Sequence, residues 1–212
     1  MPDVITMAPP EGGTARDTVN AFLRVLDAQD GSTGGGTASA LAGAMAAALA
    51  AMVARLSKGK GLSAPDAFYE ELGSDGERLS LMLAAGGARD AEAFDAVKTA
   101  FRMPRDTAEQ KDARTAAIQA ATVAAALTPL DNAALCTRVH ELVDRLAGRA
   151  NPKTLSDLQC AGYLALAGLR GCLANVEINL PAIKDQASAS AIQERALALR
   201  AAVHLDESPE AV

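Results

Sequence analysis

Aromatic residues are scarce in this chain of 212 residues, which has four Phe, two Tyr and no Trp. β-Branched residues are also sparse, and Ala and Leu make up most of the hydrophobic half of the sequence. Strands favour β-branched and aromatic side chains, whereas Ala and Leu are the strongest apolar helix formers. We therefore predict an all-α fold, a helical bundle of about seven to eight helices with a central buried helix.

Basic side chains are outnumbered, since 20 Lys and Arg face 26 Asp and Glu and the net charge is −6. No basic stripe is present, so we expect no nucleic-acid partner. The three cysteines and two histidines show no metal-type spacing. We expect no metal, no cofactor, and buried free thiols in a reducing cytoplasm. Residues 1–13 lack the basic and apolar segments of a secretory signal, which agrees with a cytoplasmic location.

Only residues 38–53 form an apolar run that invites a membrane interpretation. The run has roughly 16 residues, slightly fewer than a membrane span needs. It is also rich in Ala and Gly rather than in Leu. We therefore expect a buried helix here and no membrane association.

Proline and glycine suggest the boundaries along the chain. Residues 1–13 hold three prolines and two glycines and are predicted to be a flexible arm. Residues 14–205 are predicted to form a single helical domain, and residues 206–212 a tail. The expected helices cover about residues 17–29, 37–57, 63–86, 90–102, 106–127, 131–148, 156–180 and 183–203. Gly73 and Gly76 are expected to interrupt or bend the third of them, and Gly86 and Gly87 to end it.

No standard catalytic pattern is present: the sequence has no nucleophile elbow, Walker loop, dinucleotide fingerprint or metal-binding His pair. The segment Gly34-Gly35-Gly36-Thr37 before the long apolar helix is the strongest local motif. Three glycines allow unusual φ values and leave backbone N–H groups bare at a helix start, which suits a ligand oxygen. The other interpretation is a tight turn that lets two helices pack closely.

Three polar side chains are further candidates for a site. Asp90 follows the Gly86-Gly87 pair, where it is either the N-cap of a helix or an acid held in an apolar pocket. Asn175 and Asn179 lie four residues apart and therefore share one helix face. Their amides either serve a ligand or a partner chain, or bind the backbone near Pro181.

Four segments, taken in order, resemble the formimidoyltetrahydrofolate cyclodeaminase / methenyltetrahydrofolate cyclohydrolase family. They are residues 34–45 with Met52, Val53, Gly59 and Lys60; residues 90–94; residues 103–107 with Lys111 and Arg114; and Asn151, Ser156 and Asp157 with residues 175–180. Their order and spacing agree with the family from about residue 17 to 200. The chain differs from the pattern at Thr33, where the family often has Pro, and at the glycines near Asp90.

The resemblance implies an all-helical homodimer that binds a folate in a cleft near the dimer interface. It implies that Asp90 transfers the proton. It also implies a set of residues that line or support the folate cleft: Gly34, Gly35, Gly36, Thr37, Lys60, Ser156, Asp157, Asn175 and Asn179.

Three functional hypotheses follow. The first is an enzyme that reversibly hydrolyses 5,10-methenyltetrahydrofolate to 10-formyltetrahydrofolate, with a carboxylate that shuttles protons. The second is a formimidoyltetrahydrofolate cyclodeaminase, which releases ammonia. The third is a non-catalytic helical binding protein of the same fold, suggested by the glycines around Asp90.

Overall fold

The computed structural model describes residues 33–203, and all regular structure in this range is helical. The five α-helices are α2 (Gly35–Ser57), α3 (Asp66–Phe101), α4 (Ala108–Leu146), α5 (Leu155–Asn179) and α6 (Gln186–Ala202). Two short 3₁₀ turns, η1 (Pro152–Thr154) and η2 (Leu180–Ala182), flank α5. The all-α prediction is confirmed. The helix predicted at residues 17–29, the N-terminal arm, the tail and both domain boundaries lie outside the described residues.

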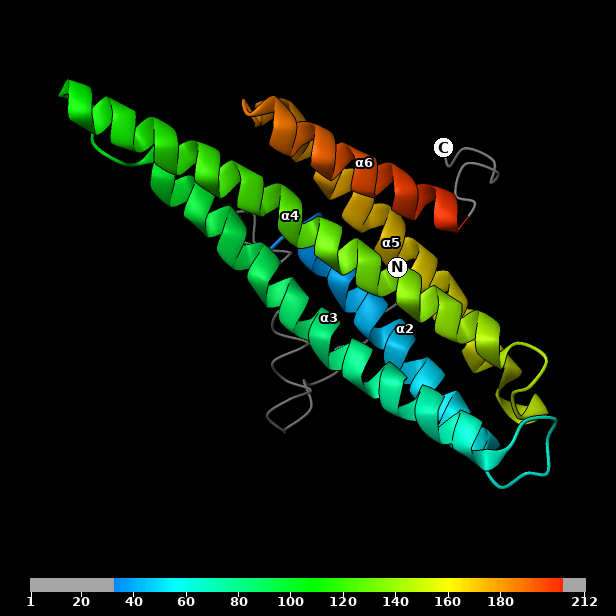
Figure 1. The fold of residues 1–212 in the computed structure, drawn as a ribbon. Helices are drawn as coiled ribbons and strands as arrows, with labels where there is room; N and C mark the ends of the chain where they lie inside the picture. Colours follow the sequence, from blue (N-terminus) through cyan, green and yellow to red (C-terminus); the bar gives the residue numbers. More distant parts are fainter. Residues whose placement is uncertain (1–32, 204–212) are drawn as a thin grey trace, which may run out of the picture.

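The helices form an elongated bundle in which successive helices run in opposite directions (Figure 1). The apolar helix α2 packs against α3, α4 and α5, and α6 covers the outer side of α4. The hairpin of α3 and α4 extends beyond the start of α2 (Figure 1). This arrangement places the first turn of α2 beside the middle of α3 and the end of α5.

The predicted number of seven to eight helices is wrong for the described range, because α3 and α4 are each continuous where two or more helices were expected. All four glycines of α3 are buried inside the helix. A Cβ on Gly76 would lie 2.9 Å from the Ala47 carbonyl oxygen of α2, and one on Gly86 would lie 2.0 Å from Asn132 Oδ1 of α4. A helical glycine costs about 1 kcal/mol relative to Ala. Packing against two neighbouring helices offsets that cost, so these glycines permit close contact and do not break the helix.

Helix α4 is also longer than expected, because Pro129 lies inside it and does not end it. Its N-terminus has a capping box formed by Thr107 and Gln110. Thr107 accepts a hydrogen bond from the Gln110 backbone N–H at 3.3 Å, and the Gln110 side chain accepts from the Thr107 N–H at 3.2 Å. The reciprocal pair satisfies two N–H groups that a helix start leaves free.

The core consists mainly of Ala and Leu, as the composition predicts, and 13 residues of α2 are buried. By length and composition, α2 is the one helix among residues 33–203 that meets the criteria for a membrane span. A buried core helix meets the same criteria, and α2 packs against three other helices of the bundle. Cys136 and Cys172 are buried free thiols, as expected, whereas Cys160 is exposed, which corrects the prediction for that residue.

Candidate functional site

Asp90 lies against the first turn of α2. A Cβ on Gly36 would come within 2.4 Å of Asp90 Oδ1 and 2.6 Å of Oδ2, so only glycine leaves room for the carboxylate in this position. The Thr37 hydroxyl donates to Asp90 Oδ2 at 3.1 Å. Asp90 is inside the continuous helix α3, so the interpretation of this residue as a helix N-cap is wrong.

The surroundings of Asp90 act on its ionisation in opposite directions. Partial burial raises the pKa of the Asp90 carboxyl above its ordinary value, and hydrogen bonds from the Thr37 side chain and backbone partly oppose this increase. The Thr37 hydroxyl also lies 3.4 Å from the Gly87 carbonyl oxygen. With its single proton, it donates to the ionised carboxylate or, when Asp90 is protonated, accepts from Asp90 and donates to Gly87. Both protonation states of Asp90 therefore find a partner.

Two amides from α5 lie across from Asp90. The Asn175 side chain would be 3.3 Å from a Cβ on Gly35, the residue before Gly36. Asn179 follows one helical turn later and donates to the Ala125 carbonyl oxygen at 3.1 Å. These residues surround a cavity of about 150 Å³, lined by Gly34, Gly35, Gly36, Asp90, Phe94, Ala125, Asn175 and Asn179.

The three glycines have different surroundings. Gly34 has an extended backbone with φ of −145°, and no described atom lies within 4 Å of a Cβ placed on it. Gly35 and Gly36 are helical and face Asn175 and Asp90. None of the three has a positive φ, so this segment does not use the unusual φ values that glycine allows. The close-packing interpretation applies to Gly36, and all three glycines border the cavity.

Three of the predicted folate residues lie at the other end of the same bundle. Lys60 follows the C-terminal end of α2, about 30 Å from Gly36 at 1.5 Å per helical residue. Asp157 is in the first turn of α5, about 27 Å along that helix from Asn175. Ser156 is exposed beside it. Within one chain, these three residues are not near Asp90.

Phe94 and Ala125 line the cavity but were not among the predicted site residues. Phe94 lies four residues after Asp90, so helical spacing alone could have placed it on the same face. The Ala125 carbonyl accepts the hydrogen bond from Asn179, and the only sequence indication of this contact is Pro129, four residues later in α4. A proline inside a helix removes the hydrogen bond to the carbonyl four residues before it.

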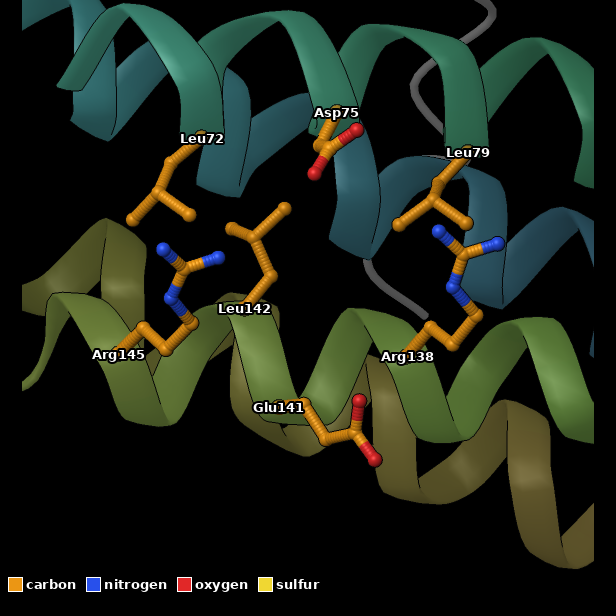
Figure 2. Close-up of a pocket in the computed structure, with 7 residues that line it drawn as sticks. All are labelled: Leu72, Asp75, Leu79, Arg138, Glu141, Leu142 and Arg145. Atoms are coloured by element: carbon orange, nitrogen blue, oxygen red, sulfur yellow. The ribbon is translucent and has the colours of Figure 1, made fainter. Parts of the chain in front are cut away.

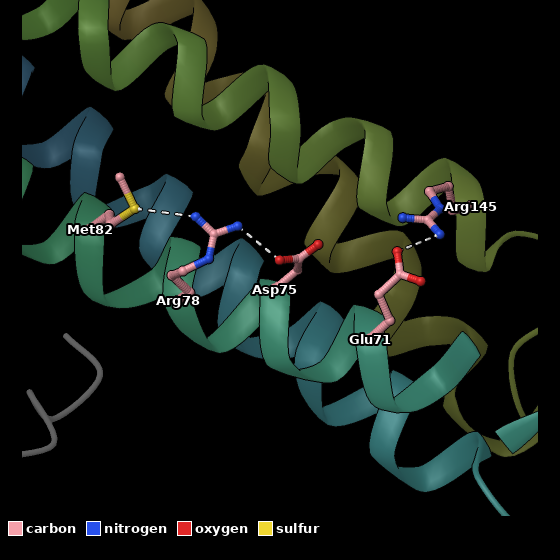
Figure 3. Close-up of polar contacts among 5 residues, drawn as sticks. All are labelled: Glu71, Asp75, Arg78, Met82 and Arg145. Atoms are coloured by element: carbon pink, nitrogen blue, oxygen red, sulfur yellow. Dashed lines mark hydrogen bonds and ion pairs between the residues drawn. The ribbon is translucent and has the colours of Figure 1, made fainter. Parts of the chain in front are cut away.

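A second cavity, of about 140 Å³, lies between α3 and α4. Arg138 and Arg145 extend from α4 toward Leu79 and Leu72 of α3, while the Glu141 carboxylate points away (Figure 2). Arg145 forms an ion pair with Glu71 at 2.9 Å, and Arg78 one with Asp75 at 2.8 Å (Figure 3). Exposed ion pairs of this kind contribute about 0–1 kcal/mol. We interpret this cavity as a surface groove and place the candidate site at Asp90.

The glycines that suggested a non-catalytic protein do not disturb Asp90. Gly86 and Gly87 are in regular helix one turn before it, and Gly87 lies against Thr37, the hydrogen-bond partner of Asp90. Among residues 33–203, no group of three His, Cys, Asp or Glu side chains is arranged to hold a metal ion. Independence from metals and cofactors stays a prediction.

Known proteins with similar sequences cover most of the chain. A methenyltetrahydrofolate cyclohydrolase of Methylorubrum extorquens is 37% identical over 174 residues, 82% of this chain and 84% of the relative. The formimidoyltransferase-cyclodeaminase of Rattus norvegicus is 31% identical over 83% of this chain, which spans only 33% of that longer protein.

A solved structure shows the same fold. The formiminotetrahydrofolate cyclodeaminase of Thermotoga maritima superposes with a TM-score of 0.76 at 27% identity, over 86% of this chain and 88% of the other. The family model described as formiminotransferase-cyclodeaminase matches residues 18–198. The residues matched by the family model include Asp90, the three glycines and the two asparagines. The chain belongs to the formiminotransferase-cyclodeaminase family.

Proposed function

We propose that this protein is an enzyme of folate one-carbon metabolism that reversibly hydrolyses 5,10-methenyltetrahydrofolate to 10-formyltetrahydrofolate. The observation that carries the proposal is the half-buried Asp90 carboxylate, bonded to Thr37 at the edge of a cavity lined by Gly34, Gly35 and Gly36. The Methylorubrum extorquens relative named for this reaction supports it.

Asp90 transfers protons in both halves of the reaction. The ionised carboxylate takes a proton from water as the water oxygen adds to the cationic carbon between N5 and N10. The protonated carboxyl then gives this proton to N5 as the carbon–N5 bond breaks, and the hydroxyl proton leaves to solvent as the formyl carbonyl forms on N10. A raised pKa suits a group that must accept and donate near neutral pH, and such catalysis typically contributes about 10²–10⁴-fold.

Cyclodeamination is the second candidate, because the Rattus norvegicus and Thermotoga maritima relatives are named for it. In that reaction N10 attacks the formimino carbon and ammonia leaves, with Asp90 as the proton donor. The test is to incubate the protein with methenyl- and formiminotetrahydrofolate separately while following methenyl absorbance and free ammonia. We expect the methenyl absorbance to fall and no ammonia to form. Ammonia release without hydrolysis would assign the second reaction.

The active form in this proposal is a homodimer. The cavity of about 150 Å³ is smaller than the roughly 300–1,000 Å³ of typical ligand pockets, so a folate needs further walls. Exposed apolar side chains, such as Met45, Leu81 and Tyr163, provide surface for a second copy. Lys60, Ser156 and Asp157 can join a folate site only if a second copy brings them to Asp90. Light scattering tests this, and a fully active monomer would contradict it.

A cytoplasmic location belongs to the same proposal, as does activity without a metal, a cofactor, a membrane or nucleic acid. Activity that survives dialysis against a chelator is the expected result for the metal. Loss of activity that added divalent cations restore would contradict it.

A further inference from the structure

Two amides on α5 have orientations fixed by the backbone around them. Asn175 Nδ2 donates to the Gly171 carbonyl oxygen at 2.8 Å. Asn179 Nδ2 donates to the carbonyl oxygens of Asn175 at 2.8 Å and Ala125 at 3.1 Å. Backbone carbonyls only accept hydrogen bonds, so the nitrogen and oxygen of either amide cannot exchange places without losing these bonds.

Pro129 strengthens the constraint on Asn179. Because proline has no N–H, the carbonyl of Ala125, four residues earlier in α4, loses its partner within the helix. Asn179 supplies the missing donor from α5. Turning this amide would leave the buried Ala125 carbonyl without a partner, and such groups are rarely left unsatisfied.

Both N–H groups of Asn179 are used, so only its oxygen is left for a ligand, while Asn175 keeps its oxygen and one N–H. Among the described residues, neither Asn175 Oδ1 nor Asn179 Oδ1 receives a hydrogen bond, and neither is an occluded polar atom. Both residues line the cavity that contains Asp90. The α5 side of the cavity thus offers two acceptor oxygens, each held in place by hydrogen bonds from the nitrogen of its own amide.

We propose, on the basis of the folate activity above, that Asn175 and Asn179 form an acceptor wall that selects a ligand edge made of hydrogen-bond donors. In tetrahydrofolate this edge is the 2-amino group and the adjacent ring N–H of the pterin. A ligand that presents acceptors there would face two amide oxygens. These cannot exchange places with their amide nitrogens without losing the hydrogen bonds described above. The wall therefore determines specificity, while Asp90 carries out the chemistry.

The test compares two substrates that differ at one group: 5,10-methenyltetrahydrofolate and its analogue with methyl in place of the 2-amino group. The wild-type enzyme is expected to prefer the amino substrate about tenfold or more in kcat/KM, since a site built for a donor rejects an analogue that lacks it. Asn175→Leu and Asn179→Leu are expected to lower kcat/KM for the amino substrate only, so that the preference falls toward one. Gln159→Leu, an exposed amide on the same helix, serves as the control and keeps the preference.

The outcomes separate the two proposals. Equal turnover of both substrates by the wild-type enzyme, or an unchanged preference in the variants, overturns the acceptor wall and leaves the folate activity in place. No turnover of either substrate overturns the folate activity itself. Asn175→Leu keeps the bond between Asn179 and Ala125, so it carries the test if Asn179→Leu is too unstable to purify.

Discussion

Asp90 Oδ1 lies only 2.4 Å from the position that a Cβ on Gly36 would occupy, so the carboxylate fills the space that the missing side chain leaves. Helix α3 supplies the acid and the first turn of α2 supplies the space and the hydrogen-bond donors. The position of the carboxylate is thus determined jointly by two residues that are 54 positions apart in the sequence.

Gly36→Ala is expected to displace the Asp90 carboxylate and to lower kcat/KM by at least about tenfold, because misplaced catalytic groups lose rate steeply. The fold should persist, since alanine favours a helix over glycine by about 0.5–1 kcal/mol. Gly162→Ala in α5 is the control, because its Cβ would meet Val143 at an ordinary 3.6 Å and Gly162 does not line the cavity. Steady-state kinetics of both variants decide this, and equal activities would contradict it.

Asp90→Asn is expected to reduce kcat by about 10²-fold or more while the protein stays folded. Burial raises the pKa of Asp90, so the folded state holds the proton more tightly than the unfolded chain. The protonated Asp90 therefore contributes to the free energy of unfolding in full below its ordinary pKa of 3.8. This contribution is lost as the pH rises through the raised pKa of the folded state.

Thermal unfolding tests the same substitution through the direction in which it changes the melting temperature. At neutral pH, Asn removes a partly buried charge, so the melting temperature should stay equal or rise. The difference should vanish below about pH 4, where the carboxyl is protonated in both states. Glu92→Gln, at an exposed position two residues later in α3, should leave both kcat and this pH dependence unchanged. A lower melting temperature for Asp90→Asn at neutral pH would count against the assignment.

Thr37→Val is expected to move the acidic limb of the kcat/KM profile to higher pH. The Thr37 hydroxyl helps to hold down the pKa of Asp90 against burial, and valine keeps the shape while removing the donor. The backbone N–H of residue 37 remains, so the shift should be partial. Thr115→Val, an exposed residue of α4 with a hydroxyl bond to its own helix, is the control. An unchanged limb would show that Thr37 does not act on the working carboxyl.

Pro129 and Asn179 are expected to be energetically coupled. Asn179→Leu should cost about 1–3 kcal/mol, because it leaves the Ala125 carbonyl without a donor. In the Pro129→Ala background the new N–H at position 129 can bond to this carbonyl, so the same substitution should cost less. Urea unfolding of the four variants measures the coupling. Effects that add within about 0.5 kcal/mol would refute it.

Gly86→Ala is expected to destabilise the fold by about 1–3 kcal/mol through overpacking. Its Cβ would lie 2.0 Å from Asn132 Oδ1, inside the interface of α3 and α4. Gly162→Ala on α5 is the comparison, because its Cβ would meet Val143 at an ordinary 3.6 Å and alanine favours a helix by about 0.5–1 kcal/mol. Denaturant midpoints should therefore move in opposite directions, and a neutral Gly86→Ala would be inconsistent with this packing.

Site residues could be predicted only where a short sequence pattern marks residues that lie close together in the fold. Glycines before an apolar helix, an acid after a glycine pair and two asparagines four apart drew attention to groups that line one cavity. Lys60, Ser156 and Asp157 came from order and spacing along the chain, which hold no information on their distance from Asp90. Ala125 was missed because Asn179 binds its backbone carbonyl, and side-chain patterns do not report on backbone groups.

The sequence by itself determined the helical class, the Ala- and Leu-rich core and the central apolar helix, because composition and periodicity are properties of short stretches of chain. Only the tertiary structure decided whether a glycine or a proline ends a helix. That outcome depends on what a Cβ at Gly76 or Gly86 would meet, and on whether a donor such as Asn179 is near the carbonyl that Pro129 releases. These contacts join residues far apart in the chain, so no local pattern contains them.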